Sequence, residues 1–299
     1  MWRKGGLLGT YLPWRDVLHE GPVPPYGTLE AVSAVRAQYL GSAGYGNPIK
    51  LQHEFQKRDA VLAKCRDYEE IVLWFEHDLY DQLQLLQILQ YLGSQSLPIG
   101  KVQLIQSDEF LGMLAPEELL ALQKKRRPVN AATFRLAAEV WDAFRAPDPQ
   151  PLFEMQDRVT SELRHLHSAM RRLFEEYPGR GTGLSRSQTQ IVQTVSEGAH
   201  RKDDIFRLSQ LREEAVYLGD STFFKYLDDL CAEPAALLTL TDGFYTPTQL
   251  AEDVLAGKRD WLTAHNIDRW IGGVHLNGSN IWRWNADTRA LGREVAATD

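Results

Sequence analysis

The sequence of 299 residues contains only two cysteines, Cys65 and Cys231. They lie far apart and each falls within a predicted helix, so the sequence predicts neither a disulfide framework nor a thiolate metal site. This usage suits a reducing compartment, and we expect a cytoplasmic protein. Arg3 and Lys4 precede a short apolar stretch, but no small-residue cleavage site follows it, so a signal peptide is not expected.

The sequence also lacks long apolar runs and basic segments. No run approaches the roughly 18 apolar residues of a membrane span, so we expect no membrane contact. The formal charge is −7 and is spread along the chain, whereas binding to a nucleic-acid backbone usually requires concentrated positive charge. Nucleic acid is therefore not an expected partner.

Motifs that hold phosphates or activate a serine are missing as well. The sequence has no GxGxxG motif, no P-loop and no GxSxG motif. It therefore gives no support to dinucleotide, P-loop or serine-nucleophile chemistry. The chemistry of this protein has to be inferred from its other polar residues.

Prolines and glycines divide the chain into segments. With 43% hydrophobic and 24% charged residues the composition is globular, and the length allows two domains. Linker-like stretches occur at 146–151 and 178–183. We predict an α/β domain over 1–147, a long connecting helix over 152–178 and a mostly helical, winged-helix-like domain over 184–299.

The last predicted domain has the element order of a winged helix, three helices followed by a two-stranded ribbon. The turn signal of that ribbon is Asp242-Gly243. A second turn signal, Asn277-Gly278, lies between two strand-like runs and predicts another hairpin near the carboxyl terminus.

Acids and a histidine follow the apolar stretch 71–75. The stretch ends in Glu76, His77 and Asp78, and Asp81 begins an apolar helical run. A short apolar run that leads into a helix is typical of a buried parallel strand and its crossover. Ligands of such sheets bind outside the carboxyl ends of the strands, so we expect the functional site here.

A second apolar run, 102–106, also ends in acids, among them Asp108. Two strands that end in carboxylates at one edge predict a Rossmann-like α/β domain with a parallel-type sheet. A further strand is expected over 7–12.

Helix capping explains part of the acidic cluster. Asp78 is a good N-cap residue, and Asp81 lies in the first turn, where the helix dipole favours a carboxylate. Such a cap contributes about 0.5 to 2 kcal/mol. Capping requires neither Glu76 nor His77. The presence of these two further titratable residues favours a functional site.

A proline-rich loop over 14–27 carries the second group of polar residues, Arg15, Asp16, His19 and Glu20. Prolines after Glu20 exclude a regular helix there. His19 lies between acids in this loop, so it is the first candidate for a general base. The alternative is a buried imidazole bonded to the backbone.

The first functional hypothesis is a small-molecule binding protein or a metal-assisted hydrolase or transferase, with a phosphorylated or nucleotide-like ligand. Carboxylates bind divalent cations, a histidine can act as base, and a guanidinium group matches phosphate oxygens. The predicted catalytic residues are His19, Glu76, His77 and Asp78, of which Glu76 and Asp78 would also hold a divalent cation. The predicted ligand-binding residues are Arg15, Asp16, Glu20, Asp81, Asp108 and Arg127. The alternative for Arg127 is a solvated basic helix end.

Two other hypotheses stay open. In one, the α/β domain senses a ligand and the winged-helix-like domain binds DNA through helix 221–231, although Asp228 and Asp229 in that helix oppose contact with phosphates. In the other, the chain is a protein-interaction component without catalysis that uses its carboxyl-terminal tryptophans. These are Trp261, Trp270, Trp282 and Trp284. The alternative for these tryptophans is the core of the second domain.

Two long strings resemble a known family. They are WRDVLHEGPVP at 14–24 and LWFEHDLYDQLQL at 73–85, supported by KKRRPVN at 124–130 and NIDRWIGGVHLNG at 266–278. The strings resemble the bacterial family called domain of unknown function 1835, and the resemblance covers nearly the whole chain. It implies an α/β amino-terminal domain and a helical carboxyl-terminal extension, and it implies no particular activity.

The chain departs from that family at its start. Members typically open with an additional strand that ends in Asn-Gly-Asp-Ser, and this chain starts at Met1 without it. Either the start lies further upstream or this copy has lost the strand. If that turn helps to hold an anion, we expect part of the site to be missing here.

Overall fold

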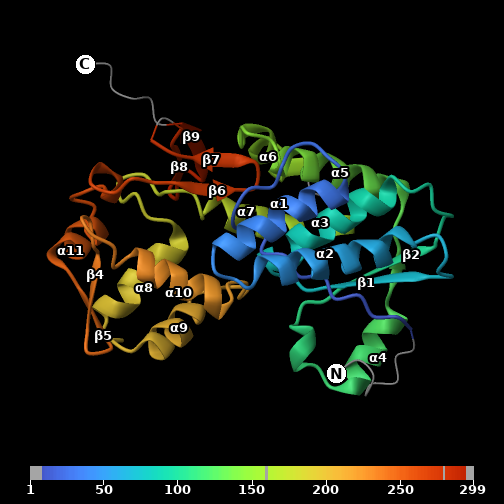
Figure 1. Cartoon of the computed structure of the whole chain (residues 1–299), viewed down its shortest axis with the longest axis horizontal. Helices are drawn as coiled ribbons and strands as arrows, with labels where there is room; N and C mark the ends of the chain where they lie inside the picture. Colours follow the sequence, from blue (N-terminus) through green and yellow to red (C-terminus); the bar gives the residue numbers. More distant parts are fainter. Residues whose placement is uncertain (1–8, 159–160, 279, 294–299) are drawn as a thin grey trace. The chain divides into compact units, whose positions relative to one another are not determined.

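The computed structural model describes residues 9–158, 161–278 and 280–293 (Figure 1). The chain forms two compact units that divide between Met170 and Arg171, and residues 270–274 belong to the first unit. Helices and small sheets both occur, which confirms a mixed α/β protein. In the described part of the chain, no helix is long and apolar enough to cross a membrane.

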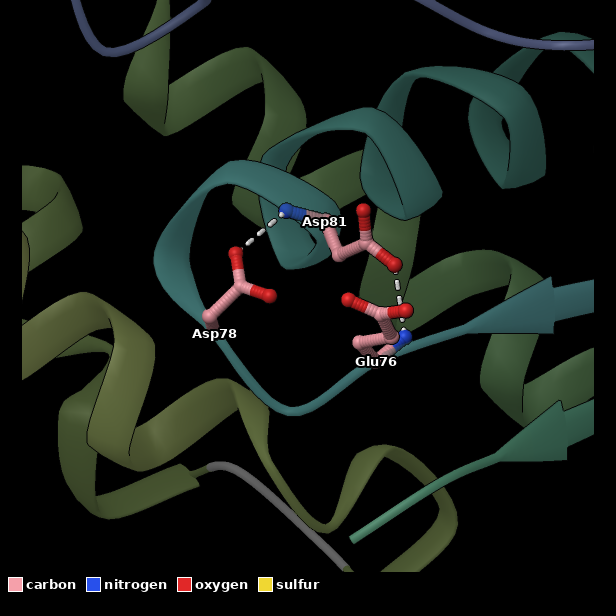
Figure 2. A group of neighbouring side chains, drawn as sticks. All are labelled: Glu76, Asp78 and Asp81. Atoms are coloured by element: carbon pink, nitrogen blue, oxygen red, sulfur yellow. Dashed lines mark hydrogen bonds between the residues drawn. The ribbon is translucent and has the colours of Figure 1, made fainter. Parts of the chain in front are cut away.

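The first unit contains a three-stranded sheet. β1 (Ile71–Phe75) and β2 (Val102–Gln106) pair in parallel, and the short β3 (Arg127–Pro128) pairs antiparallel with β2. α3 (Leu79–Gly93) is the crossover between β1 and β2. The carboxyl ends of the two parallel strands therefore lie at one edge of the sheet, where Glu76 follows β1 (Figure 2).

Helices pack in pairs in the first unit. α1 (Leu29–Ser42) packs against α2 (Pro48–Ala63), and α3 packs against α5 (Ala131–Phe144). α4 (Pro116–Lys124) has Pro116 at its first helical position, where the missing amide is not needed. The side chains of Thr28, Asp78 and Asn130 each accept a hydrogen bond from the amide three residues later. This confirms the N-cap predicted at Asp78 and shows the same local cap at the starts of α1 and α5.

The proline-rich loop runs along α3 in the opposite direction. The Trp14 indole donates to Oε1 of Gln87 at 2.9 Å, whereas the His19 ring lies 6.1 Å from the ring of Tyr80, at the start of α3. The loop therefore carries His19 toward the end of β1. No strand forms over residues 9–12, the described part of the strand predicted before this loop, because no described strand pairs with them.

The single helix predicted over 152–178 is interrupted. α6 (Gln150–Glu154) ends early, short 3-10 turns follow, and α7 (Leu166–Phe174) is a separate helix. The Gln106 side chain donates to the Glu162 carbonyl oxygen at 2.8 Å. In a continuous helix this oxygen would accept from the amide four residues later. The apolar residues spaced by three and four along this segment predict a buried stripe, and Leu163, Leu166, Met170 and Leu173 are indeed buried. Val159 of the same stripe lies outside the described residues.

Helices and a hairpin form most of the second unit. They are α8 (Arg186–Ser196), α9 (Lys202–Gln210), α10 (Asp220–Asp229), β4 (Leu238–Thr241), β5 (Phe244–Pro247) and α11 (Gln249–Leu255). α8 contacts α9, α10, α11 and β5, so it is the central helix of this unit. The hairpin turn predicted at Asp242-Gly243 is confirmed, since both residues have positive φ, 52° and 79°, as a two-residue type I′ turn requires.

The turn predicted at Asn277-Gly278 forms, but it is closed by a single antiparallel bridge between Asn277 and Asn280 rather than by a two-stranded ladder. The last four strands are β6 (Arg269–Ile271), β7 (Val274–Leu276), β8 (Trp282–Asn285) and β9 (Ala290–Arg293). β7 pairs with β6 and β8 pairs with β9, so the first turn falls at Gly272 and Gly273. Gly272 has a φ of 59°, and a Cβ on Gly273 would lie 1.8 Å from the Arg145 carbonyl oxygen. This close approach of two backbones requires glycine there.

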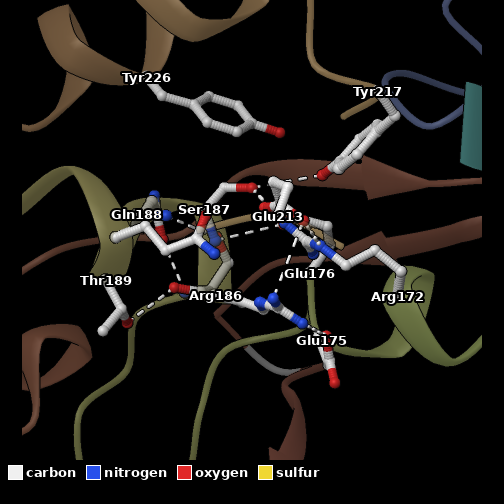
Figure 3. Close-up of polar contacts among 12 residues, drawn as sticks. Arg172, Glu175, Glu176, Arg186, Ser187, Gln188, Thr189, Glu213, Tyr217 and Tyr226 are labelled. Carbon is white, nitrogen blue, oxygen red and sulfur yellow. Dashed lines mark hydrogen bonds and ion pairs between the residues drawn. The ribbon is translucent and has the colours of Figure 1, made fainter. Parts of the chain in front are cut away.

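Charged side chains are buried within the second unit (Figure 3). Oε1 of the fully buried Glu176 accepts from Nη1 of Arg172 at 2.8 Å and from the Ser187 hydroxyl at 2.6 Å. Its Oε2 accepts from Nη2 of Arg269 at 2.9 Å. Burial alone would raise the pKa of Glu176, but the two guanidinium groups hold that pKa well below its ordinary value.

We expect Glu176→Gln to lower the free energy of unfolding by about 3 to 5 kcal/mol at pH 7, because Arg172 and Arg269 then lose their shared buried charge. The folded pKa of Glu176 is depressed, so its contribution is complete above the ordinary value of 4.5 and declines as the pH falls below it. The difference between wild type and variant should therefore shrink at pH 3 to 4. Urea unfolding at both pH values measures this. The exposed Glu252→Gln is the control, and an equal effect of both variants would contradict the assignment.

Candidate functional site

Three carboxylates lie together where β1 leads into α3 (Figure 2). Glu76 follows the last residue of β1, Asp78 is the N-cap of α3 and Asp81 lies in the first turn of that helix. One oxygen from each of the three lies within 4.8 Å of the others. The cluster brings together two residues predicted as cation ligands, Glu76 and Asp78, and adds Asp81 as a third.

Backbone amides hold each carboxylate in place. Oδ1 of Asp78 accepts from the Asp81 amide at 3.1 Å, and Oδ2 of Asp81 accepts from the Glu76 amide at 2.6 Å. Oε1 of Glu76 accepts from the Leu111 amide at 2.7 Å. The second oxygen of each carboxylate has no hydrogen-bond partner among the described residues. The three side chains are therefore oriented, and each keeps an oxygen for a ligand.

Burial and mutual repulsion raise the proton affinity of this cluster. Burial, together with the negative charges of Asp81 and Glu76, raises the pKa of Asp78 to about 7. Burial likewise raises the pKa of Asp81 to about 6, with a contribution from Glu76, and it raises the pKa of Glu76. The raised pKa values show that the ionised carboxylates are unfavourable here. A bound cation would stabilise the ionised form of each of these carboxylates.

One histidine, His77, lies among the carboxylates in the chain and acts on Glu76, and a second, His165, lies near His77. The His77 ring lies 5.0 Å from the Phe110 ring and 6.0 Å from the His165 ring. Nδ1 of His77 is buried and has no partner in the described part of the chain. Burial and the charge of Arg164 lower the pKa of His165, which favours its neutral form, and its Nε2 lies 3.5 Å from Asp108. The sequence pattern does not single out His165, because it lies far along the chain from β1.

Asp16 of the proline-rich loop has a structural role in this conformation, and Glu20 of the same loop is buried. Asp16 is buried, and its Oδ1 accepts from Nε of Arg36 at 2.9 Å. Arg36 also donates to the carbonyls of Val17 and Glu20, at 2.8 Å and 2.7 Å. This single guanidinium group therefore fixes the path of the loop. The sequence pattern does not single out Arg36, whose only local signal is a helical position on a partly apolar face.

His19 and Arg15 lie near the start of α3 but not within the carboxylate cluster. The His19 side chain is 1% exposed, so a substrate does not reach it in this conformation. This burial fits the alternative of a structural imidazole. Arg15 is exposed. Burial raises the pKa of the neighbouring Tyr80 hydroxyl, and the charge of Arg15 opposes this rise.

Asp108 and Arg127 are both exposed at the surface. Oδ2 of Asp108 accepts from Nη2 of Arg164 at 2.9 Å, and its side chain is 67% exposed. Arg127 lies on β3 opposite Leu104, and no hydrogen bond or ion pair among the described residues joins it to the carboxylates. Asp108 therefore borders the site through His165, whereas Arg127 does not take part in its hydrogen bonding.

No family model, curated protein or solved structure matches this chain. The resemblance to the family called domain of unknown function 1835 therefore stays a prediction, and functional inference rests on the chemistry of the site.

We expect Asp78→Asn to remove a pH-dependent loss of stability. The folded pKa of Asp78, about 7, lies above its ordinary value of 3.8, so its contribution to stability is complete below pH 3.8 and is lost as the pH rises through 7. At about 1.4 kcal/mol per pKa unit, wild type should lose roughly 2 to 3 kcal/mol between pH 5 and pH 8 from this group. Asparagine caps a helix as well as aspartate does, so the variant keeps the cap. Urea unfolding at both pH values measures the slope; Asp108→Asn is the exposed control, and an unchanged slope in Asp78→Asn would refute the assignment.

Proposed function

We propose that Glu76, Asp78 and Asp81 bind a divalent cation and that the protein uses this site to act on a small phosphorylated or nucleotide-like molecule. The observation that carries the proposal is the set of three oriented carboxylates, each with an oxygen that no described residue occupies. An all-oxygen set of ligands suits Mg²⁺, Mn²⁺ or Ca²⁺ rather than a thiophilic metal. Such ions usually keep open positions that waters or phosphate oxygens fill.

Neighbouring residues support a reaction at this edge of the sheet. Arg15 and Arg164 are exposed guanidinium groups near the site, and such groups pair with phosphate oxygens. His77 lies among the carboxylates in the chain and His165 lies near His77, and both can take up or release a proton during hydrolysis or group transfer. A bound divalent cation would supply Lewis-acid stabilisation of charge on the phosphate.

We infer that the first unit is Rossmann-like and the second is winged-helix-like. The parallel pair β1 and β2 with its helical crossover supports the first inference. Three helices followed by the β4–β5 hairpin, with α8 at the centre, support the second. Because α10 begins at Asp220 and ends in Asp228 and Asp229, an interaction with protein suits this unit better than an interaction with DNA.

The cation site is tested by thermal melting with and without Mg²⁺, Mn²⁺ or Ca²⁺ at pH 7.5. A cation at a hundredfold over its dissociation constant should stabilise the folded protein by about 2.7 kcal/mol, which raises the melting temperature by several degrees. Asp78→Asn and Asp81→Asn should lose this rise, and Asp108→Asn should keep it. The proposal fails if no cation shifts wild type, or if both cluster variants respond as wild type does.

Turnover is tested by phosphate release from a panel of nucleotides and sugar phosphates in the presence of the stabilising cation. We expect His77→Gln to reduce the rate by roughly 10² to 10⁴, the usual contribution of general acid–base catalysis, while the cation-induced rise in melting temperature persists. His200→Gln, in the second unit, should leave the rate unchanged. Equal rates in wild type and His77→Gln would exclude proton transfer by His77.

A further inference from the structure

A second pocket lies in the first unit, at the other end of α3. It is a cavity of about 300 Å³ between the start of α1, the second half of α3 and the end of α5. The lining residues are Gly27, Thr28, Leu29, Val32, Gln87, Gln90, Tyr91, Ser94, Gln95, Trp141 and Arg145. A volume near the lower end of the range for ligand sites suits a small metabolite. We call it the α1–α3–α5 pocket.

The α1–α3–α5 pocket is separate from the carboxylate cluster. Its lining residues on and just after α3 follow Asp81 by six to fourteen positions, from Gln87 to Gln95. At a rise of 1.5 Å per residue this corresponds to about 9 to 21 Å along the helix. None of the three clustered carboxylates lines the pocket. A ligand here would bind independently of the cation site.

A buried side-chain amide supplies a hydrogen-bond donor to this pocket. Gln87 is 2% exposed, and its Oε1 accepts from the Trp14 indole at 2.9 Å. Because an indole N–H can only donate, this bond fixes the orientation of the amide and leaves Nε2 as the free donor. Nε2 has no partner among the described residues. This donor is not among the buried polar atoms without a partner, so it is accessible to a ligand or to water.

The first turn of α1 adds backbone donors on a second side of the pocket. The Thr28 hydroxyl accepts from the Ala31 amide, whereas the amides of Leu29 and Glu30 have no partner in the described part of the chain. The start of this 14-residue helix also carries the positive end of the helix dipole. Glu30 is exposed and does not line the pocket. Free amides and this dipole together favour an anion.

Arg145 is the only charged side chain in the lining of the α1–α3–α5 pocket. Its side chain is 8% exposed; Nη1 donates to the Pro24 carbonyl at 3.3 Å and Nη2 to Asp142 at 2.5 Å. Nε has no partner among the described residues. Asp142, which pairs with Arg145, has a side chain that is 65% exposed, and no acidic side chain is among the lining residues. Val32 and Trp141 supply the apolar part of its wall.

We propose that the α1–α3–α5 pocket binds a small organic anion, a carboxylate or phosphate that carries a flat apolar group. The anionic group accepts from Nε2 of Gln87 and from the amide of Leu29, and the charge of Arg145 attracts it. The apolar group lies against Trp141 and Val32. Nothing in this binding requires the divalent cation.

The test is isothermal titration calorimetry of the full chain with phenyl phosphate and with benzoate, in EDTA at pH 7.5. Binding of either compound with a dissociation constant of about 1 mM or lower is the expected result, and the tighter of the two identifies the anionic group that the pocket prefers. Absence of binding by both compounds overturns the proposal.

Two variants locate the binding. Gln87→Glu keeps the acceptor for Trp14 but replaces the donor with negative charge, and it should weaken binding by at least roughly tenfold. Leu29→Pro removes one amide at the first helical position, where proline is favoured and the extended Thr28 tolerates it, so it should weaken binding without loss of the helix. If Gln87→Glu does not fold, as judged by circular dichroism, Leu29→Pro decides.

Two controls separate this pocket from the cation site. Gln56→Glu, an exposed position on α2, adds the same charge elsewhere and should bind as wild type does. Asp78→Asn should also bind as wild type does, whether or not the cluster binds a cation. Wild-type affinity in both pocket variants, or loss of binding in Asp78→Asn, overturns the assignment to this pocket.

Discussion

The burial of α3 is the constraint on which the first unit depends. Its side chains are buried on almost every face, including the polar side chains of Gln82, Gln84 and Gln87. A buried amide costs free energy unless it is hydrogen-bonded. Gln82 accordingly donates to the backbone at the end of β1 at 2.7 Å, Gln84 donates to the Asp16 carbonyl at 3.2 Å, and Gln87 accepts from Trp14. Three glutamines thus hold the strand end and the proline-rich loop against one helix.

The two ends of the same helix have opposite electrostatic character. At its start, amides and the helix dipole attract carboxylates. Burial raises the pKa of Glu76, Asp78 and Asp81, and repulsion within the cluster adds to the rise for the two aspartates. Near its end, donors from Gln87 and α1 and the charge of Arg145 surround the α1–α3–α5 pocket. We propose a cation at the first site and an anion at the second. Both proposed sites lie along a single helix, α3.

The second unit is organised by a different interaction. Glu176 is buried with arginines on both of its oxygens, and such an ion pair is stable only when every charge has a partner. Trp261 and Trp284 are buried in the same unit, and the Trp261 indole donates to the Ala235 carbonyl at 2.8 Å. These two tryptophans therefore belong to its core, which removes much of the exposed aromatic surface that a protein-interaction role would use.

Local interactions were readable from the sequence by itself. Strand β1, the caps of α1, α3 and α5, the Asp242-Gly243 turn and the acids at the end of β1 all follow from rules that act over a few residues. Non-local contacts decided the rest. The bond from Gln106 to Glu162 accompanies the break in a predicted helix, the approach of Gly273 to Arg145 accompanies a turn that was not predicted, and Arg36 engages Asp16. His165 and the α1–α3–α5 pocket likewise join segments far apart in the chain, because sequence spacing carries no record of which surfaces will meet.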